Sequence, residues 1–269
     1  MSERASEQPT IVFIHGAWVT PLCWDEFAGY FSERGYACIA PPWPGKEGGV
    51  EALRVDPSAL AGLGIAEIVD HYESIVRDLP APPVLIGHSF GGLFVQLLLD
   101  RGLGAAGVAI DSAPPRGVNG VTWSSLRSLG SVLRTWRGWR KVVRWSFPQF
   151  RYAFVHTLPE EEARAAYERH VTPETGRVFF QAALAPVNPR SPARINFDNA
   201  TRAPLLLVAG ELDRIVPAKL NRANHRKYTR PAARTDLISF PGRTHWIIAQ
   251  DGWEEVAGAI HDWLGALDE

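Results

Sequence analysis

The sequence predicts an α/β protein built on a doubly wound, mostly parallel β-sheet, with a helical insertion in the second half of the chain. Short apolar runs rich in Val, Ile and Leu are bounded by Gly or Pro, as in strands buried on both faces. These runs cover residues 10–16, 36–43, 83–89, 107–111, 204–210 and 235–242. Amphipathic segments of helical length separate or follow them, near residues 24–34, 65–79, 91–101, 217–228 and 252–267. Strands and helices that alternate in this order favour parallel pairing through helical crossovers.

Composition limits the class of protein. The 269 residues, 46% of them hydrophobic, can bury one large core, so we expect one domain with an insertion. A formal charge of -1 gives no overall attraction to nucleic acid. Cys23 and Cys38 are too few for a disulfide framework, and no run reaches the ~18 apolar residues of a membrane span. We therefore expect a cytoplasmic protein with a disordered tail at residues 1–9.

One segment interrupts the alternation of strands and helices. Residues 112–159 contain no strand-like run and no acidic residue, but eight basic residues interleaved with aromatic ones. We expect residues 10–111 and 200–269 to form the core, and residues 112–199 to form a helical cap or lid. A single helical wheel would place six apolar side chains on one side and four basic ones on the other, unless Gly130 and Gly138 split the segment into shorter helices. The apolar set is Leu126, Leu129, Leu133, Trp136, Trp139 and Val143, and the basic set is Arg127, Arg134, Arg137 and Lys141. This pattern predicts a lid over a site, or alternatively a weak contact with an anionic membrane surface.

Ser89 lies at the sharpest bend that the sequence predicts. Residues 87–91, Gly-His-Ser-Phe-Gly, fit the pattern G-x-S-x-G between an apolar strand and a helix-forming segment. The turn from strand to helix is so tight that larger side chains at 87 and 91 would collide, which explains the glycines. It would hold the hydroxyl at the carboxyl end of the sheet, where open α/β sheets bind ligands. A nucleophilic serine is therefore predicted.

A serine nucleophile needs a base, and the base needs a carboxylate to orient it. His245 follows the last predicted strand and Asp213 follows the strand before it, which gives the chain order Ser, Asp, His. Asp111 ends the strand at 107–111 and is an alternative acid. It could instead only accept hydrogen bonds from nearby backbone amides.

Four motifs together resemble those of the α/β-hydrolase superfamily: HGAW at 15–18, GHSFGG at 87–92, GELDRIVP at 210–217 and GRTHW at 242–246. The resemblance covers nearly the whole chain except the insertion, and it implies the α/β-hydrolase fold. It also implies that Ser89 is the nucleophile, His245 the base and Asp213 the acid, with an oxyanion hole formed by the backbone amides of Ala17 and Phe90. The first motif is similar to that of the esterase and hydroxynitrile-lyase branch.

A serine in this turn predicts acyl chemistry on an ester, thioester or lactone, through an acyl-Ser89 intermediate that water then hydrolyses. We expect a small to medium hydrophobic acyl substrate, no cofactor, no metal and no nucleic-acid partner. The expected pocket residues are mostly aromatic: Trp18, His15, Trp123, Trp136, Trp139 and Trp246. Two alternatives remain open, a hydroxynitrile-lyase-type C–C lyase and a ligand sensor whose intact triad turns over slowly.

Overall fold

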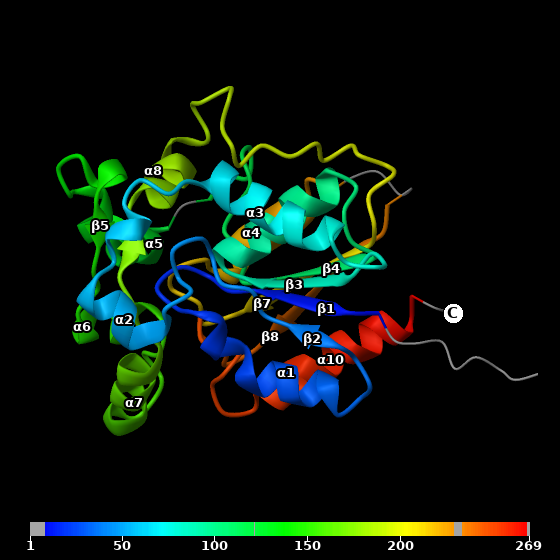
Figure 1. Ribbon diagram of the computed structural model, residues 1–269, viewed down its shortest axis with the longest axis horizontal. Helices are drawn as coiled ribbons and strands as arrows, with labels where there is room; N and C mark the ends of the chain where they lie inside the picture. Colours follow the sequence, from blue (N-terminus) through cyan, green and yellow to red (C-terminus); the bar gives the residue numbers. More distant parts are fainter. Residues whose placement is uncertain (1–8, 121, 229–232, 268–269) are drawn as a thin grey trace, which may run out of the picture.

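The computed structural model describes residues 9–120, 122–228 and 233–267, so the predicted disordered tail lies almost wholly outside the described residues (Figure 1). Its centre is a six-stranded sheet in the order β2-β1-β3-β4-β7-β8. The strands are β1 (Ile11–Ile14), β2 (Cys38–Ile39), β3 (Val84–His88), β4 (Ala106–Ile110), β7 (Leu205–Gly210) and β8 (Thr235–Phe240). All of them pair in parallel, and each lies within a predicted apolar run or one residue from it.

The register of the inner strands brings their carboxyl ends to one edge. Gly87 of β3 is level with Ile14 of β1, and His88 is level with Ile110 of β4. The residues that follow these strands, including Ser89 and Asp111, therefore lie together at the carboxyl end of the sheet. The strand order reverses at β1, between β2 and β3, and such a switch point is where open α/β sheets form their ligand crevice.

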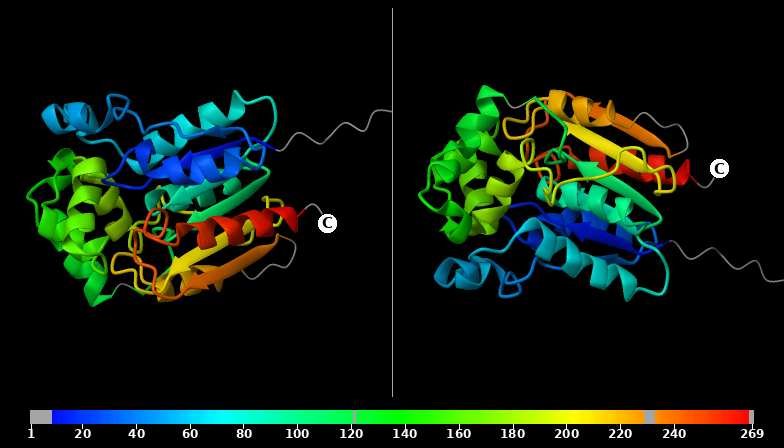
Figure 2. Two further views of the ribbon diagram at one scale, coloured as in Figure 1. Left: turned by 90° about the horizontal axis from the view of Figure 1, so that it is seen from below. Right: turned by 90° about the horizontal axis from the view of Figure 1, so that it is seen from above.

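Helices cover both faces of the sheet, as predicted (Figures 1 and 2). On one face lie α1 (Asp25–Ser32) and α10 (Trp253–Gly265), and on the other lie α3 (Ile65–Arg77), α4 (Phe90–Asp100) and α9 (Ala218–His225). Their buried side chains join the fully buried strands β1, β3, β4 and β7 in one hydrophobic core, whereas β2 and most of β8 are partly buried. Between β2 and α3, the helix α2 (Gly49–Val55) and the short turn η2 (Ser58–Leu60) extend toward the insertion, and a further turn, η1 (Pro21–Trp24), precedes α1.

The insertion forms a cap over the carboxyl ends of the strands, at one end of the molecule (Figures 1 and 2). Its elements are α5 (Trp123–Leu133), η3 (Gly138–Arg140), β5 (Val142–Val143), α6 (Phe147–Ala153), α7 (Glu160–His170), β6 (Glu174–Thr175) and α8 (Arg177–Leu184). The expectation of no strand within residues 112–159 is wrong, because β5 pairs with β6 in an antiparallel ribbon. Two residues are too few to produce the alternating pattern by which a strand is detected in a sequence.

The predicted helical wheel also needs correction. The helix α5 ends at Leu133, and Arg137 turns the chain with φ 54°, so the residues beyond it do not continue the helical phase. Within α5 the buried residues are Ser125, Ser128 and Val132, whereas Leu126 is 49% exposed. A wheel assumes one continuous helix, and the structure does not contain one over this range.

Polar contacts join the cap to the loop that carries α2. The Arg54 guanidinium donates to three backbone carbonyls of the cap, those of Val171, Tyr167 and Glu168. Thr175 donates its hydroxyl to the Leu63 carbonyl at 2.7 Å. The cap is thus attached to the core by several hydrogen bonds along its inner side. No helix in the described ranges has both the length and the hydropathy needed to cross a bilayer.

Candidate active site

Ser89 joins β3 to α4 in a strained backbone conformation, with φ 58° and ψ -118°. A non-glycine residue in such a region costs on the order of 1–3 kcal/mol and requires support from its surroundings. Support comes from two backbone hydrogen bonds of 2.9 Å, from the Ser89 amide to the Ile110 carbonyl and from the Ala113 amide to the Ser89 carbonyl. A Cβ at Gly87 would overlap the Gly91 carbonyl, so residue 87 must be glycine. The bend holds the Ser89 hydroxyl at the carboxyl end of β3.

His245 and Asp213 are brought together from the loops after β8 and β7. The imidazole Nδ1 and the carboxylate Oδ2 are 2.6 Å apart, and both side chains are fully buried. The other carboxylate oxygen accepts the backbone amides of Ile215 at 2.6 Å and Val216 at 2.9 Å. Asp213 is therefore held by its own loop while it orients the imidazole. In a serine triad the acid holds the base in this way.

Ser89 and His245 are not joined by a hydrogen bond in this structure. Nε2 of His245 is buried and has no hydrogen-bond partner among the described residues. Because Nδ1 donates to Asp213, Nε2 is the nitrogen left to accept a proton. Bonds between a nucleophile and its base are commonly loose in unliganded enzymes and tighten with substrate. Two of the three predicted residues are thus in hydrogen-bonded contact, and the third follows His88, whose ring bonds the His245 carbonyl.

Asp111, the alternative acid, does not bond to His245. One carboxyl oxygen accepts the Gly210 amide at 2.7 Å, and the other is buried without a partner in the described part of the chain. Burial, followed by the charge on Asp213, raises the pKa of Asp111 well above its ordinary value. Asp111 therefore holds its proton more tightly than a solvent-exposed carboxyl group does, and it does not orient the base.

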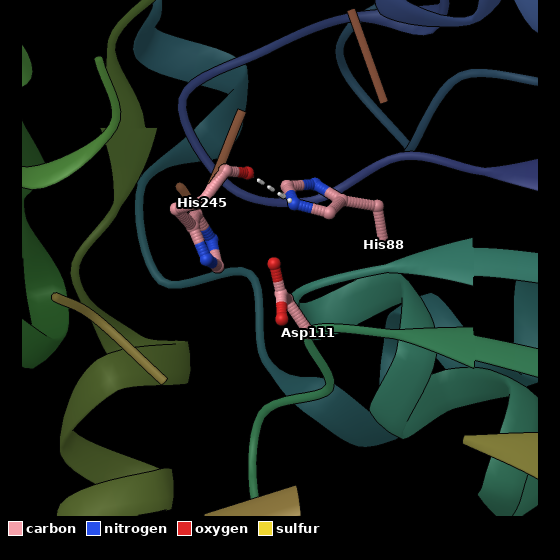
Figure 3. Close-up of side chains that lie close together, drawn as sticks. All are labelled: His88, Asp111 and His245. Atoms are coloured by element: carbon pink, nitrogen blue, oxygen red, sulfur yellow. Dashed lines mark hydrogen bonds between the residues drawn. The ribbon is translucent and has the colours of Figure 1, made fainter. Parts of the chain in front are cut away.

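His88 lies beside His245 and bonds its backbone carbonyl (Figure 3). Its Nε2–H donates to the backbone carbonyl of His245 at 2.8 Å, and the two ring centroids are 4.6 Å apart. Burial, and then the charge of His245, lower the pKa of His88 well below its ordinary value, so the ring is neutral. Sequence reasoning missed this residue, because it fills a variable position of the serine motif. The bond positions the loop that carries the base.

His88, Asp111 and His245 are close enough to hold a metal ion, with one ligand atom from each lying within 4.8 Å of the others (Figure 3). One nitrogen of each ring is already bonded: Nε2 of His88 donates to the His245 carbonyl, and Nδ1 of His245 faces Asp213. The second nitrogen of each ring and one Asp111 oxygen are buried without a partner among the described residues. The bond from His88 to the His245 backbone makes support of the base one role of this cluster.

The two predicted oxyanion donors lie beside Ser89. Phe90 begins α4, and Ala17 follows Gly16, where a Cβ would lie only 2.8 Å from the Ser89 Cβ. Neither amide donates a hydrogen bond within the described part of the chain. Two backbone N–H groups are thus available next to the hydroxyl, as stabilisation of a tetrahedral oxyanion requires.

The residue after Ala17 is held by the cap. Trp18 has φ 64°, its amide donates to Glu174 Oε2 at 3.1 Å, and its carbonyl accepts the Thr172 amide at 2.8 Å. Glu174 is itself paired with Lys46 at 2.6 Å, and both side chains are fully buried. Sequence reasoning missed this ion pair, because 128 positions separate its members. The cap therefore fixes the conformation of residues 15–18, which we call the oxyanion loop.

A cavity of about 220 Å³ opens beside Ser89. Ser89 and Ser125 are the polar side chains among its lining residues, which are Trp18, Ser89, Phe90, Ala113, Pro114, Ser125, Leu126, Leu129, Leu133, Phe179, Ala182, Ala183, Ile215, Val216 and Leu220. The cavity suits an apolar group attached to a carbonyl at Ser89.

Most of the aromatic residues predicted for the pocket lie elsewhere. Trp18 lines the cavity, but Trp123, Trp136 and Trp139 do not, and the first two are each 79% exposed. Trp246 is buried, with its ring near the side chains of α6 and the end of α7. His15 braces the oxyanion loop: its Nδ1–H donates to the Gly16 carbonyl and its Nε2 accepts the Trp43 amide. The cavity is lined instead by smaller residues of α5, α8 and the loop after β7.

The model of the alpha/beta hydrolase family matches residues 11–259. No curated protein matches the sequence. Solved structures share the fold at low identity. A monoacylglycerol lipase from Paleococcus ferrophilus is 20% identical with a TM-score of 0.65, over 96% of this chain and 95% of that chain. A pyrethroid hydrolase from Sphingobium faniae is 19% identical with a TM-score of 0.68, over 96% of this chain and 98% of that chain. A methylesterase from Arabidopsis is 15% identical with a TM-score of 0.67, over 96% of this chain and 99% of that chain.

Proposed function

The chain belongs to the alpha/beta hydrolase family, and we propose that it is a serine hydrolase that cleaves esters of small to medium hydrophobic acyl groups. One observation carries the proposal. Ser89, held in its strained bend, lines an apolar cavity within the same fold that pairs His245 with Asp213 at 2.6 Å. The similarity to a lipase, a pyrethroid hydrolase and a methylesterase is consistent with this chemistry.

The reaction follows from the positions of these groups. Oγ of Ser89 attacks the ester carbonyl while Nε2 of His245 takes its proton, and Asp213 stabilises the imidazolium. The oxyanion accepts hydrogen bonds from the amides of Ala17 and Phe90, each worth roughly 3–4 kcal/mol in the transition state. Collapse of the intermediate expels the alcohol, which takes the proton from His245. Water activated by the same imidazole then hydrolyses the acyl-Ser89 ester.

The cavity supports a limit on acyl size. Pockets for drug-sized ligands have volumes of about 300–1,000 Å³, and this one holds about 220 Å³. Its apolar walls stabilise a hydrophobic acyl group by roughly 25 cal/mol for each Å² of apolar surface removed from water. Short aliphatic or single-ring acyl groups fit this description, as esters, thioesters or lactones.

The two alternative functions have less support. A hydroxynitrile lyase must stabilise departing cyanide, and no cationic side chain is among the residues that line the cavity. A ligand sensor would have no need for oxyanion donors, whereas the Ala17 and Phe90 amides have no hydrogen-bond acceptor among the described residues.

A fluorophosphonate probe tests the nucleophile. We expect stoichiometric labelling at Ser89 and release of p-nitrophenol from p-nitrophenyl butyrate, both lost in Ser89→Ala. Ser125→Ala is the matched control, because this second serine lines the same cavity, and the variant should still be labelled at Ser89. Labelling without turnover would favour the sensor. Cyanide release from a cyanohydrin without an acyl-enzyme would favour the lyase.

The choice of acid can be tested with two asparagine variants. Asp213→Asn removes the charge that faces His245 Nδ1 and should lower kcat by about 10⁴-fold, as loss of this charge does in other serine triads. Asp111→Asn keeps an oxygen for the Gly210 amide and should retain most of the activity. Steady-state kinetics on the same ester measures both, and equal losses would contradict the assignment.

A further inference from the structure

Most of the strongly exposed large hydrophobic side chains among the described residues lie in the cap. Among the described residues eight large hydrophobic side chains are strongly exposed, and six of them belong to the cap: Trp123, Leu126, Trp136, Trp139, Leu184 and Val187. Tryptophan is costly to leave in water, and exposed apolar patches on soluble domains mark contact surfaces. The cap lies at one end of the molecule (Figure 2), so these side chains form a candidate contact surface at that end.

One side of α5 forms a continuous hollow of about 590 Å³, which we call the outer α5 face. It consists of Trp123, Leu126, Arg127, Gly130, Ser131, Leu133 and Arg134. Apolar side chains, two guanidiniums and no carboxylate thus share one helical surface. This combination is typical of helices that lie in the interface of an anionic bilayer.

The basic charge continues past the end of α5. Arg137, Arg140 and Lys141 follow it in the turn around η3, and all three are exposed. Within the ranges that the structure describes, neither these three nor Arg127 and Arg134 form an ion pair with a carboxylate. A second copy of the chain would bring like charges together, whereas an anionic surface complements them.

The outer α5 face is also close to the reactive cavity. Leu126 and Leu133 line both the outer hollow and the cavity beside Ser89. These two side chains therefore contact both spaces. An apolar chain that lies in the outer hollow therefore has a short path to the hydroxyl.

We propose that the outer α5 face docks on an anionic lipid surface, and that amphiphilic esters pass from this surface between Leu126 and Leu133 to Ser89. The docking requires no catalysis. The delivery of esters rests on the proposed function. Tryptophan and leucine would enter the boundary between headgroups and acyl chains, while the arginines would pair with lipid phosphates.

Vesicle flotation tests the docking, using the full chain as Ser89→Ala so that no ester is cleaved. We expect flotation with vesicles of phosphatidylglycerol and phosphatidylcholine, little with phosphatidylcholine alone, and a steep loss with salt. Trp123→Ser/Trp136→Ser and Arg134→Glu/Arg137→Glu should each weaken binding by roughly tenfold or more. Val55→Ser is the matched control, since this side chain is 84% exposed but lies on α2, and it should bind normally.

Three outcomes would overturn the docking. They are no flotation with anionic vesicles, equal weakening by Val55→Ser, and a dimer in sedimentation velocity that Trp123→Ser dissociates. A kinetic arm tests the delivery with the active enzyme. The tryptophan variant should lose roughly tenfold in rate on an ester carried in anionic vesicles, and should keep its rate on water-soluble p-nitrophenyl acetate. Equal loss on both substrates would contradict delivery, without affecting the flotation result or the probe test of Ser89.

Discussion

The inner side of the cap and the outer α5 face depart from the usual distribution of residues in opposite ways. Beneath the cap, Lys46 and Glu174 are charged and fully buried, and Asp111 and His88 are buried polar groups nearby on the sheet edge. On the outside, Trp123 is 79% exposed. Buried charge and exposed tryptophan both cost free energy. The buried charge holds a loop in position, and the exposed tryptophan lies on the surface that we propose to dock on lipid.

In the buried pair of Lys46 and Glu174, the Lys46 ammonium nitrogen and both Glu174 carboxylate oxygens have hydrogen-bond partners. Lys46 donates to Glu174 and to the Val19 carbonyl at 3.0 Å, while Glu174 also accepts the amides of Trp18 and Thr175. A buried pair of this kind contributes little net stability compared with apolar residues, but removal of one partner is costly. The pair therefore positions the oxyanion loop more than it stabilises the fold.

The largest effect should come from Glu174→Leu alone. It leaves the Lys46 ammonium buried without a counter-charge, which should lower the free energy of unfolding by about 3–5 kcal/mol in urea denaturation. Adding Lys46→Met to the same protein removes the stranded charge and should restore most of the loss. If the single and double variants were equally stable, the description of a buried ion pair would be wrong.

A second comparison separates positioning from charge. Lys46→Met/Glu174→Gln and Lys46→Met/Glu174→Leu both lack the ion pair, but only glutamine can still accept the Trp18 amide. The leucine version should lose roughly tenfold or more in kcat relative to the glutamine version, with KM little changed, because an oxyanion donor acts in the transition state. Equal kcat values would mean that Glu174 does not position the oxyanion loop.

Asp111→Asn should produce a smaller, pH-dependent effect. Because burial and Asp213 raise the pKa of Asp111 above the ~3.9 of an unfolded chain, its contribution to stability is complete below about pH 4 and is lost as pH rises through the folded-state pKa. The amide does not ionise. The Tm of the variant should therefore rise relative to wild type between pH 4 and pH 8, by about 2–4 °C for each kcal/mol gained.

Thermal melts across this pH range measure the difference. The lowered pKa of His88 gives the opposite slope, but it acts in both proteins and cancels in their difference. A constant gap in Tm from pH 4 to pH 8 would show that Asp111 does not hold its proton more tightly in the folded state.

The smallest effect is expected on the outer α5 face. Trp123→Ala should change the free energy of unfolding by no more than about 0.5 kcal/mol, because the side chain is 79% exposed. Trp145→Ala, in the same cap, should cost about 3–5 kcal/mol, since that ring is 3% exposed and stacks on Trp18 at 3.5 Å. Similar losses for the two variants would remove the distinction between the two sides of the cap.

Local chemistry predicted a large part of this protein. The six strands were visible as apolar runs, and the serine bend was visible because its glycines are required where backbone meets backbone, as at Gly87. Asp213 and His245 were found from their places after consecutive strands. These features depend on neighbouring residues, which a sequence displays directly.

Only the tertiary structure decided how distant segments meet. It made Asp213, and not the nearby Asp111, the hydrogen-bond partner of His245; it paired Lys46 with Glu174; and it turned Trp123 outward, away from the predicted pocket. The first two depend on where loops end after the sheet and the cap have packed. The outward position of Trp123 depends on where α5 ends and on which side of α5 packs against the rest of the protein. A helix with apolar residues on two sides has no unique inner face in its sequence.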